Sequence, residues 1–383
     1  MSDGAGPFAA QADDLARLDS SSRRRRLVRQ AGVDFASNDY LGLRASGLLA
    51  DAARAALDSG VPLGSGGSRL LGGNHPEHEA LEADAAAFFG SESALCFSTG
   101  YAANSALLAT LPQRGDLIVH DELVHASAHE GIRLGRAHSV SARHNDVGHV
   151  EDVIAGARAT GFTGRAWIAV ESLYSMDGDR APLADLLALA DRHDAVLLID
   201  EAHATGVFGN NGRGLADSIS GRDNVITLRT FGKALGCEGA VVCGPAVVRD
   251  FLVNRARQFI FSTAPSPLMA AVARAALGIV RDEPMRRTAL WERISAAERV
   301  LSPLGGVAHG SQILPVIIGE DAPTMALAAR LQAAGLDVRG IRPPTVPEGT
   351  SRLRVSITLN ASVADIERLG ATLAAGQVEL QAA

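Results

Sequence analysis

The 383-residue chain has few aromatic side chains and few cysteines. Aromatic residues make up 4% of the chain, whereas hydrophobic residues make up 47%, so the core must consist mainly of alanine, leucine and valine. Three cysteines, Cys96, Cys237 and Cys243, cannot form a paired disulfide framework and are typical of buried free thiols in a reducing compartment. A chain of this length can bury a large core, which we expect to be divided into two or three lobes.

The sequence also lacks the features of membrane proteins and nucleic-acid-binding proteins. No apolar run reaches the length that spans a bilayer, and the N-terminus has no signal-peptide pattern. The net charge of −7 gives no reason to expect a nucleic-acid partner, in spite of four consecutive arginines at 23–26. We find no internal repeat and no low-complexity linker. These absences favour a soluble globular enzyme in the cytoplasm.

Short apolar stretches alternate with helix-like stretches through most of the chain. The predicted strands cover 94–97, 117–119, 167–170, 196–199 and 225–228, and an amphipathic helix is predicted at 77–89. Tandem strand–helix units are typical of a parallel sheet covered by helices. A long helical run is predicted at 267–300. The C-terminal part is predicted to hold strands and helices at 313–318, 324–334, 336–341, 353–357 and 363–375.

The most informative stretch runs from Thr230 to Gly236 and directly follows the predicted strand at 225–228. Gly232 and Gly236 flank Lys233, and glycines there allow a sharp turn and the close approach of a ligand. A lysine amine held in this loop could form a Schiff base with an aldehyde cofactor, and Thr230 could bind a phosphate. A solvated lysine at a strand end is the alternative interpretation.

A second stretch strengthens the catalytic interpretation. Asp200 ends the apolar strand at 196–199, and His203 follows on the next loop. Open parallel sheets place their chemistry at the carboxyl ends of strands. A pyridoxal 5'-phosphate site needs a Schiff-base lysine, a carboxylate for the pyridinium nitrogen and phosphate ligands, which Lys233, Asp200 and Thr230 would supply. Asp200 and His203 could also be a loop cap or half of a metal site, but no third ligand follows at metal spacing, so no metal is predicted.

Two glycine-containing segments are candidates for phosphate binding. Gly100 and Tyr101 open a predicted helix, where backbone N–H groups and the helix dipole favour an anion, so their N–H groups are the predicted phosphate ligands. The segment 60–74 holds six glycines but has neither a Gly-Lys-Ser/Thr motif nor dinucleotide-binding spacing. A nucleotide-dependent oxidoreductase is therefore poorly supported.

Several motifs recur in an order that resembles one enzyme family. They are Asn38-Asp-Tyr-Leu-Gly-Leu43, Ser172-Leu-Tyr-Ser-Met-Asp-Gly-Asp179, the two stretches around Asp200 and Lys233, and Arg352-Leu-Arg354. Together they resemble the α-oxoamine synthases, pyridoxal-phosphate enzymes of fold type I. The resemblance implies an α/β fold: an N-terminal segment at 1–45, a large domain at 46–280 with a mostly parallel seven-stranded sheet covered by helices, and an α+β C-terminal domain at 281–383.

The resemblance also implies a role for each residue that matches a family motif around the cofactor. Lys233 would carry the cofactor and later move protons, and Asp200 would stay ionised opposite the ring nitrogen. His203 would bond the phenolic oxygen of the cofactor. His125 would stack on the ring face, although a histidine that only caps a helix is the alternative.

Further residues are implied to contact the cofactor or to be structural. Ser175 would contact the cofactor, whereas Glu171 and Asp177 are interpreted as structural. Thr263 resembles the residue that reaches the phosphate in a partner subunit, which implies a homodimer with shared active sites.

The substrates are implied by the resemblance as well. Arg354 would hold the carboxylate of the amino acid, with Arg352 and Arg339 as alternatives. The stretch 341–347 looks most like the branch that condenses L-alanine with a pimeloyl thioester, carried by coenzyme A or by acyl carrier protein. The alternatives are three related enzymes of the family, 5-aminolevulinate synthase, 2-amino-3-ketobutyrate–CoA ligase and serine palmitoyltransferase, or a non-catalytic partner subunit. The predicted substrate-binding residues are Arg24, Asn38, Arg342, Thr345 and Arg354.

Overall fold

The computed structural model describes residues 6–382 and divides into two compact units. The large unit comprises Asn38–Ser175 and Asp179–Ala289, and the described part of the small unit comprises residues 6–37, 176–178 and 290–382. These bounds differ from the predicted domains. Of the predicted N-terminal segment at 1–45, residues 6–37 belong to the small unit and residues 38–45 to the large unit, and the first five residues lie outside the described residues. The reason is a parallel pairing of β1 (Val33–Asp34) with β10 (Leu336–Asp337).

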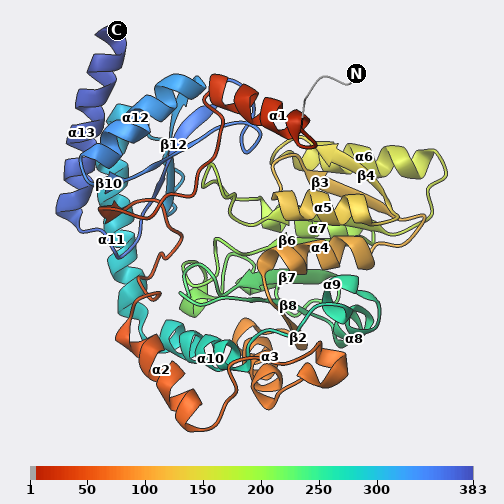
Figure 1. Cartoon of the computed structure of the whole chain (residues 1–383). Coiled ribbons are helices and arrows are strands. Elements are labelled where there is room, and N and C mark those ends of the chain that lie inside the picture. Colours follow the sequence, from red (N-terminus) through yellow and green to blue (C-terminus); the bar gives the residue numbers. More distant parts are fainter. Residues whose placement is uncertain (1–5, 383) are drawn as a thin grey trace. The chain divides into compact units, whose positions relative to one another are not determined.

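A seven-stranded sheet forms the centre of the large unit (Figure 1). Neighbouring strands from β4 through β3, β5 and β6 to β7 are parallel, and β8 is antiparallel to both β7 and β2. The prediction of a mostly parallel seven-stranded sheet is confirmed. In spatial order the strands are β2 (Ser93–Phe97), β8 (Ala240–Gly244), β7 (Val225–Thr230), β6 (Val196–Asp200), β5 (Ala166–Glu171), β3 (Leu117–Asp121) and β4 (His138–Ala142).

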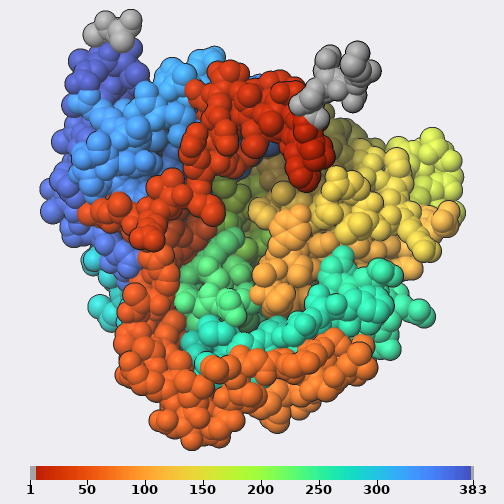
Figure 2. All heavy atoms as spheres, viewed as in Figure 1, coloured from red at the N-terminus to blue at the C-terminus, as the bar shows by residue number. Residues whose placement is uncertain are grey.

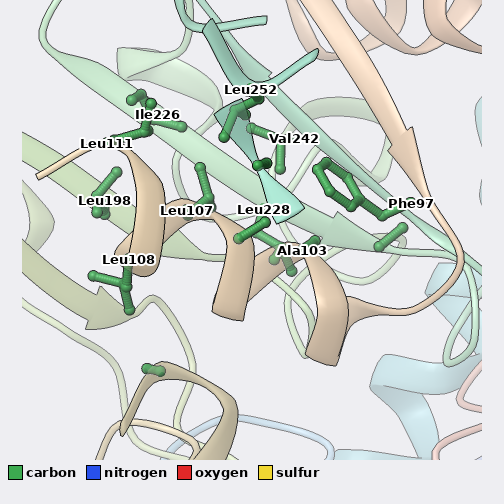
Figure 3. Close-up of a cluster of buried hydrophobic side chains, with 14 of the residues drawn as sticks. Phe97, Ala103, Leu107, Leu108, Leu111, Leu198, Ile226, Leu228, Val242 and Leu252 are labelled. Atoms are coloured by element: carbon green, nitrogen blue, oxygen red, sulfur yellow. The ribbon is translucent and has the colours of Figure 1, made fainter. Parts of the chain in front are cut away.

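Helices cover both faces of this sheet. On one face, apolar side chains of α4 pack against β7 and β8, and Figure 3 shows Leu107 directed at the cluster that includes Leu228 and Val242. A second buried cluster, with Ile154 of α6 and Leu189 of α7, covers the other face. The helices of the large unit are α2 (Gly47–Asp58), α3 (Pro76–Phe89), α4 (Gly100–Thr110), α5 (Ala126–Leu134), α6 (Val147–Ala159), α7 (Leu183–Arg192), α8 (Ala246–Arg255), α9 (Arg257–Ile260) and α10 (Pro267–Asp282).

The predicted helical run at 267–300 is not continuous. It consists of α10 and α11 (Pro284–Leu301), which are separated at Glu283. Proline has no backbone N–H and clashes with the preceding turn, so Pro284 begins a new helix and cannot continue the old one. Within the large unit, α10 packs along α2 and α3, and Figure 2 shows this helix in teal beside the orange surface of α3.

A buried ion pair stabilises the sheet close to the carboxyl ends of its parallel strands. Arg229 of β7 and Glu201, which follows β6, are both inaccessible to solvent, and their charged atoms lie 3.0 Å apart. The guanidinium also lies 4.2 Å from the ring centroid of Phe89. Removing one partner of such a pair leaves an uncompensated buried charge, which costs roughly 3–5 kcal/mol.

The small unit contains a three-stranded antiparallel sheet in the order β11-β12-β9. The predicted single strand at 336–341 is in fact two strands in different sheets, because β10 pairs with β1 whereas β11 pairs with β12. Among the described residues, no helix combines the length and the apolar character that crossing a membrane requires. The elements are α1 (Ala9–Ser20), β9 (Ile313–Gly319), α12 (Asp321–Ala333), β11 (Arg339–Ile341), β12 (Ser351–Ser356) and α13 (Val363–Ala382).

Candidate active site

The predicted cofactor residues lie at one edge of the seven-stranded sheet, where the parallel strands end. Asp200 is in register with Glu171 of β5 on one side and with Leu228 of β7 on the other. Phe97 of β2 and Thr230 of β7 both pair with Ala240, so these two strands also end at this edge. The strand order therefore brings Asp200, the Lys233 loop and the beginning of α4 to the same edge.

The loop that carries Lys233 is fixed by close backbone packing. Thr230 Oγ1 accepts a hydrogen bond from the Gly232 N–H at 3.2 Å and donates one to the Gly239 carbonyl at 3.1 Å. Gly236 has a φ of +67°, and a Cβ there would lie 2.4 Å from the Arg44 nitrogen, so only glycine fits. Lys233 itself is half-buried.

Lys233 is also the single lysine of the whole chain, and the remaining 35 of the 36 basic residues are arginines. Arginine stays protonated at any accessible pH, whereas a lysine amine can lose its proton and attack a carbonyl. The residue composition thus leaves Lys233 as the one side-chain amine able to form a Schiff base. This signal was present in the sequence and was not used in the prediction.

The N-terminus of α4 provides two backbone donors next to Thr230. The side chain of Thr99 caps the helix by accepting a hydrogen bond from the Ala102 N–H at 3.0 Å. The N–H groups of Gly100 and Tyr101 come earlier in the helix and have no intrahelical acceptor. A Cβ built on Gly100 would lie 3.9 Å from Thr230 Oγ1, so these three predicted phosphate ligands are close together.

Asp200 is held by two hydrogen-bond donors. Its Oδ1 accepts from the Ala202 N–H at 2.8 Å, and its Oδ2 accepts from Asn104 Nδ2 at 2.7 Å. The same amide nitrogen donates to Ser127 Oγ, which lies 2.7 Å from His125 Nδ1. These two donors fix the orientation of the carboxylate that is predicted to face the ring nitrogen of the cofactor.

His125 caps α5 and joins this network from the other end. Its side chain is accessible to a ligand, and its ring lies 6.3 Å from that of Tyr101. The surrounding protein lowers the pKa of His125 below its usual value; the carboxylate of Asp200 opposes this effect and Lys233 adds to it. The imidazole is therefore neutral at pH 7, which suits a ring that stacks on an aromatic face.

His203 and Asn38 are connected through a residue that the prediction did not assign to the site. The hydroxyl of the fully buried Tyr40 lies 2.7 Å from His203 Nδ1 and donates to Asn38 Oδ1 at 3.0 Å. Asn38 was predicted to bind substrate, and the structure places it in the hydrogen-bond chain of His203. Tyr40 stands within the Asn38–Leu43 motif, so its position in that motif was the available signal.

Ser175 and Thr263 have different surroundings from the residues above. The Ser175 N–H donates to Glu171 Oε2 at 3.2 Å, which fixes the loop after β5. Thr263 is exposed, and among the described residues the structure gives it no hydrogen bond to the other cofactor candidates. Its neighbours Ala264 and Pro265 bond to Gly67 and Ser65, which joins the Thr263 segment to the glycine-rich loop.

The remaining substrate candidates belong to the small unit. Arg354 is buried on β12 and donates to Ser356 Oγ at 2.7 Å. Arg352 and Arg339, the two alternatives for this role, both form ion pairs. Arg352 pairs with Asp177, and Arg339 pairs with Asp337 at 2.7 Å.

The arginines of the run at 23–26 have different hydrogen-bond and ion-pair partners. Arg23 forms ion pairs with Asp321 and Glu348, and Arg24 forms one with Asp19. Arg25 instead donates to Thr345 Oγ1 at 3.1 Å and has no ion pair with any residue that the structure describes.

Arg342, half-buried, completes this group. It donates to the Ser22 carbonyl, and its pKa is lowered by burial and by the charge of Arg25. Within the arginine run, Arg25 thus contacts Thr345, and the binding of substrate by Arg24 stays a prediction.

The comparisons with known proteins agree with this arrangement. The aminotransferase class I and II family matches residues 30–372. An 8-amino-7-oxononanoate synthase from Anaeromyxobacter dehalogenans is 44% identical over 379 residues, 94% of each chain, and 8-amino-7-oxononanoate synthase 2 from Bacillus subtilis is 41% identical over 88% of this chain and 85% of its own. The chain belongs to the 8-amino-7-oxononanoate synthase family.

Solved structures extend the likeness to the α-oxoamine synthases and confirm the expected type I fold. A serine palmitoyltransferase variant from S. paucimobilis with a bound PLP–myriocin aldimine has a TM-score of 0.90 at 26% identity, and each chain is fully covered. The 8-amino-7-oxononanoate synthase of Francisella tularensis has a TM-score of 0.77 at 26% identity, over 92% of this chain and 99% of its own. The chain is a pyridoxal-phosphate-dependent enzyme of this family.

The residues at the sheet edge fit this cofactor. The Asp200 carboxylate, held by two donors, suits the ring nitrogen, and Lys233 suits the aldehyde. The first two N–H groups of α4 suit the phosphate, and the accessible neutral imidazole of His125 suits the ring face. No cluster of three or more histidine, cysteine or acidic side chains suited to a metal occurs in the described part of the chain. Asn104, Ser127 and Tyr40 complete the site, and the prediction assigned none of them to it.

His144 lies between the carboxylates of Asp121 and Asp179, and this group, here called the clamp, fixes the C-terminal end of the Ser172–Asp179 loop. His144 Nδ1 lies 2.9 Å from Asp121 Oδ1, and His144 Nε2 lies 2.7 Å from Asp179 Oδ2. Burial disfavours the charge of His144, but the hydrogen bonds to both carboxylates outweigh it and raise the pKa to about 10.

This clamp predicts a pH-dependent stability. Because the pKa of His144 rises from 6.5 unfolded to about 10 folded, its contribution is complete below pH 6.5 and is lost as the pH rises through about 10. His144→Gln should therefore lose roughly 1–3 kcal/mol of unfolding free energy near neutral pH and much less above the folded pKa. Urea unfolding across this range measures the effect, with His138→Gln as an exposed control. Parallel pH profiles for wild type and His144→Gln would contradict it.

Proposed function

We propose that the enzyme condenses L-alanine with a pimeloyl thioester, with loss of carbon dioxide, to give 8-amino-7-oxononanoate for biotin synthesis. The observation that carries the proposal is the convergence of Asp200, Lys233 and the α4 N-terminus at one sheet edge. This site occurs in a chain 41–44% identical to relatives that bear the name of that activity.

The cofactor would be held by groups that the fold fixes in place. When bound, pyridoxal phosphate supplies the electron sink that makes an amino acid's α-proton removable. Asp200 would face the ring nitrogen, while Gly100, Tyr101 and Thr230 would bind the phosphate. His203, oriented by Tyr40, would bond the phenolic oxygen.

Lys233 would move the proton. A neutral amine can take the α-proton of alanine and later return a proton to the product, and Lys233 is the one side-chain amine in the chain. The fixed loop from Thr230 to Gly239 would hold that amine in position. Arg354 would bind the carboxylate of alanine, because a planar guanidinium can bond both oxygens.

The substrate assignment is tested by comparing amino acids and thioesters directly. Pure cofactor-loaded protein is incubated with alanine, glycine or serine, each with pimeloyl-, succinyl- or palmitoyl-CoA, and products are followed by mass spectrometry. We expect alanine with the pimeloyl thioester to give the highest kcat/KM. Faster condensation of glycine with succinyl-CoA would refute the proposal while leaving the reaction class intact. Pimeloyl-acyl carrier protein in a parallel arm identifies the preferred carrier.

The acyl end of the substrate would be recognised by Arg25, Arg342 and Thr345. A pimeloyl chain ends in a carboxylate, and two neighbouring guanidinium groups, those of Arg25 and Arg342, are suited to bind it. Arg23 and Arg24 already have carboxylate partners, so the contacts favour Arg25 over the predicted Arg24.

Single alanine variants should separate these arginines. Arg25→Ala should raise the KM for the pimeloyl thioester at least about tenfold with little change in kcat, because binding is lost and the chemistry is not. Arg24→Ala is the matched control and should change KM much less. An equal effect of both variants, or a fall in kcat alone for Arg25→Ala, would contradict the assignment.

We also propose a cytoplasmic homodimer with shared active sites. Thr263 is exposed, and the glycine-rich loop joined to its segment carries the exposed side chains Leu63 and Leu71, at 71% and 84% accessibility. Phe261, also 71% exposed, lies two residues from Thr263. Such a group of exposed apolar residues is typical of an interaction surface.

Hybrid dimers test the sharing of sites. Lys233→Ala chains and Thr263→Glu chains should each be inactive or strongly impaired, because the first lacks the amine and the second repels the phosphate. If Thr263 serves the partner's site, a hybrid of the two contains one intact site and regains activity. Absence of any recovery, with subunit exchange confirmed by native mass spectrometry, would rule out shared sites.

A further inference from the structure

Two carboxyl groups stand side by side at the functional edge of the sheet. Glu171 ends β5 and Asp200 ends β6, and the two residues are direct register partners. Both line a small cavity of about 20 Å³, together with Asn104 and His125. The proposed function uses Asp200 and gives Glu171 no part.

The surroundings of the two groups differ. Asp200 receives hydrogen bonds from the Asn104 amide and the Ala202 N–H. Glu171 is 3% exposed, and its Oε2 accepts one bond, from the Ser175 N–H at 3.2 Å. Its Oε1 is buried and has no hydrogen-bond partner in the part of the chain that the structure describes.

An ionised Glu171 would be unfavourable in this position. A buried carboxylate oxygen without a donor loses its hydration and regains nothing, which is costly for a charged atom. Burial raises the pKa of Glu171 well above its usual range, and the charges of Asp200 and of Asp121 at the end of β3 raise it further. Lys233 and the Ser175 N–H act in the opposite direction but do not offset burial.

We propose that Glu171 is a positioning residue, held as a neutral carboxylic acid, that fixes the backbone of Ser175 and leaves Asp200 as the anion facing the cofactor's ring nitrogen. Two neighbouring carboxyl groups with different environments can take different protonation states, one neutral and one charged. The inference rests on the cofactor site of the proposed function and is independent of alanine and the pimeloyl thioester as substrates.

The protonation state can be observed without substrate. Infrared spectra of the cofactor-loaded wild type at neutral pH should contain the carbonyl stretch of a protonated carboxylic acid that is absent in Glu171→Gln. Glu122→Gln, a change at an exposed glutamate, is the control and should keep that band. Loss of a carboxylate band instead, with no change in the carboxylic-acid region, would overturn the proposal.

The pH dependence of stability gives a second readout with a definite sign. A folded pKa raised above the ordinary 4.5 means that the folded state keeps a proton which the unfolded state releases. The unfolding free energy of wild type relative to Glu171→Gln should therefore fall as the pH rises above about 4.5. A constant difference across this range would contradict a neutral Glu171.

The positioning role is tested by comparing two replacements. Glu171→Gln keeps a neutral acceptor for the Ser175 N–H, so cofactor affinity and the pH titration of the cofactor's visible absorption should match wild type. Glu171→Leu removes the acceptor and should weaken cofactor binding at least about tenfold, the effect of one unsatisfied buried donor. A changed titration in Glu171→Gln would show that an anion had been removed. Wild-type affinity in Glu171→Leu would remove the positioning role.

Discussion

The catalytic edge depends on how Asp200 is held. Its carboxylate lies at the end of a buried strand, where the Asn104 amide and the Ala202 N–H each donate a hydrogen bond to one of its oxygens. Asn104 belongs to α4, whose first N–H groups are the predicted phosphate ligands. In the proposed site, one helix therefore holds both the carboxylate opposite the ring nitrogen and the donors for the phosphate.

The strand order explains why these groups meet. β5, β6 and β7 are parallel neighbours, so Glu171, Asp200 and Thr230 all lie where their strands end. The buried Arg229–Glu201 pair joins the last two of these strands immediately behind the edge. The neighbouring charge of Asp200 disfavours an ionised Glu171, and burial of Glu171, whose Oε1 has no donor among the described residues, is the main reason why we assign the proton to Glu171.

Much of the site could be predicted from local sequence, and the rest depends on contacts between distant residues. Asp200 ends β6, Gly100 begins α4 and Lys233 lies on the loop after β7, so strand and helix patterns locate them. The bonds from Asn104 to Asp200 and from Tyr40 to His203 join residues 96 and 163 positions apart, which no local pattern reveals.

The fold, too, depends on contacts between distant residues that local sequence patterns do not reveal. The β1–β10 pairing, which places residues 6–37 in the small unit, is equally non-local. The break at Pro284, by contrast, was visible in the sequence, because proline marks the start of a helix more readily than its interior.

The most direct test of the account is the chemical identity of the cofactor's attachment point. Borohydride reduction of the cofactor-loaded enzyme, followed by peptide mapping, should place the pyridoxyl group on Lys233, and Lys233→Arg should abolish the label. Because Lys233 is the chain's one lysine, the N-terminal amine is the one competing primary amine. A pyridoxyl group at the N-terminus, or a cofactor retained by the enzyme but not fixed by reduction, would contradict the account.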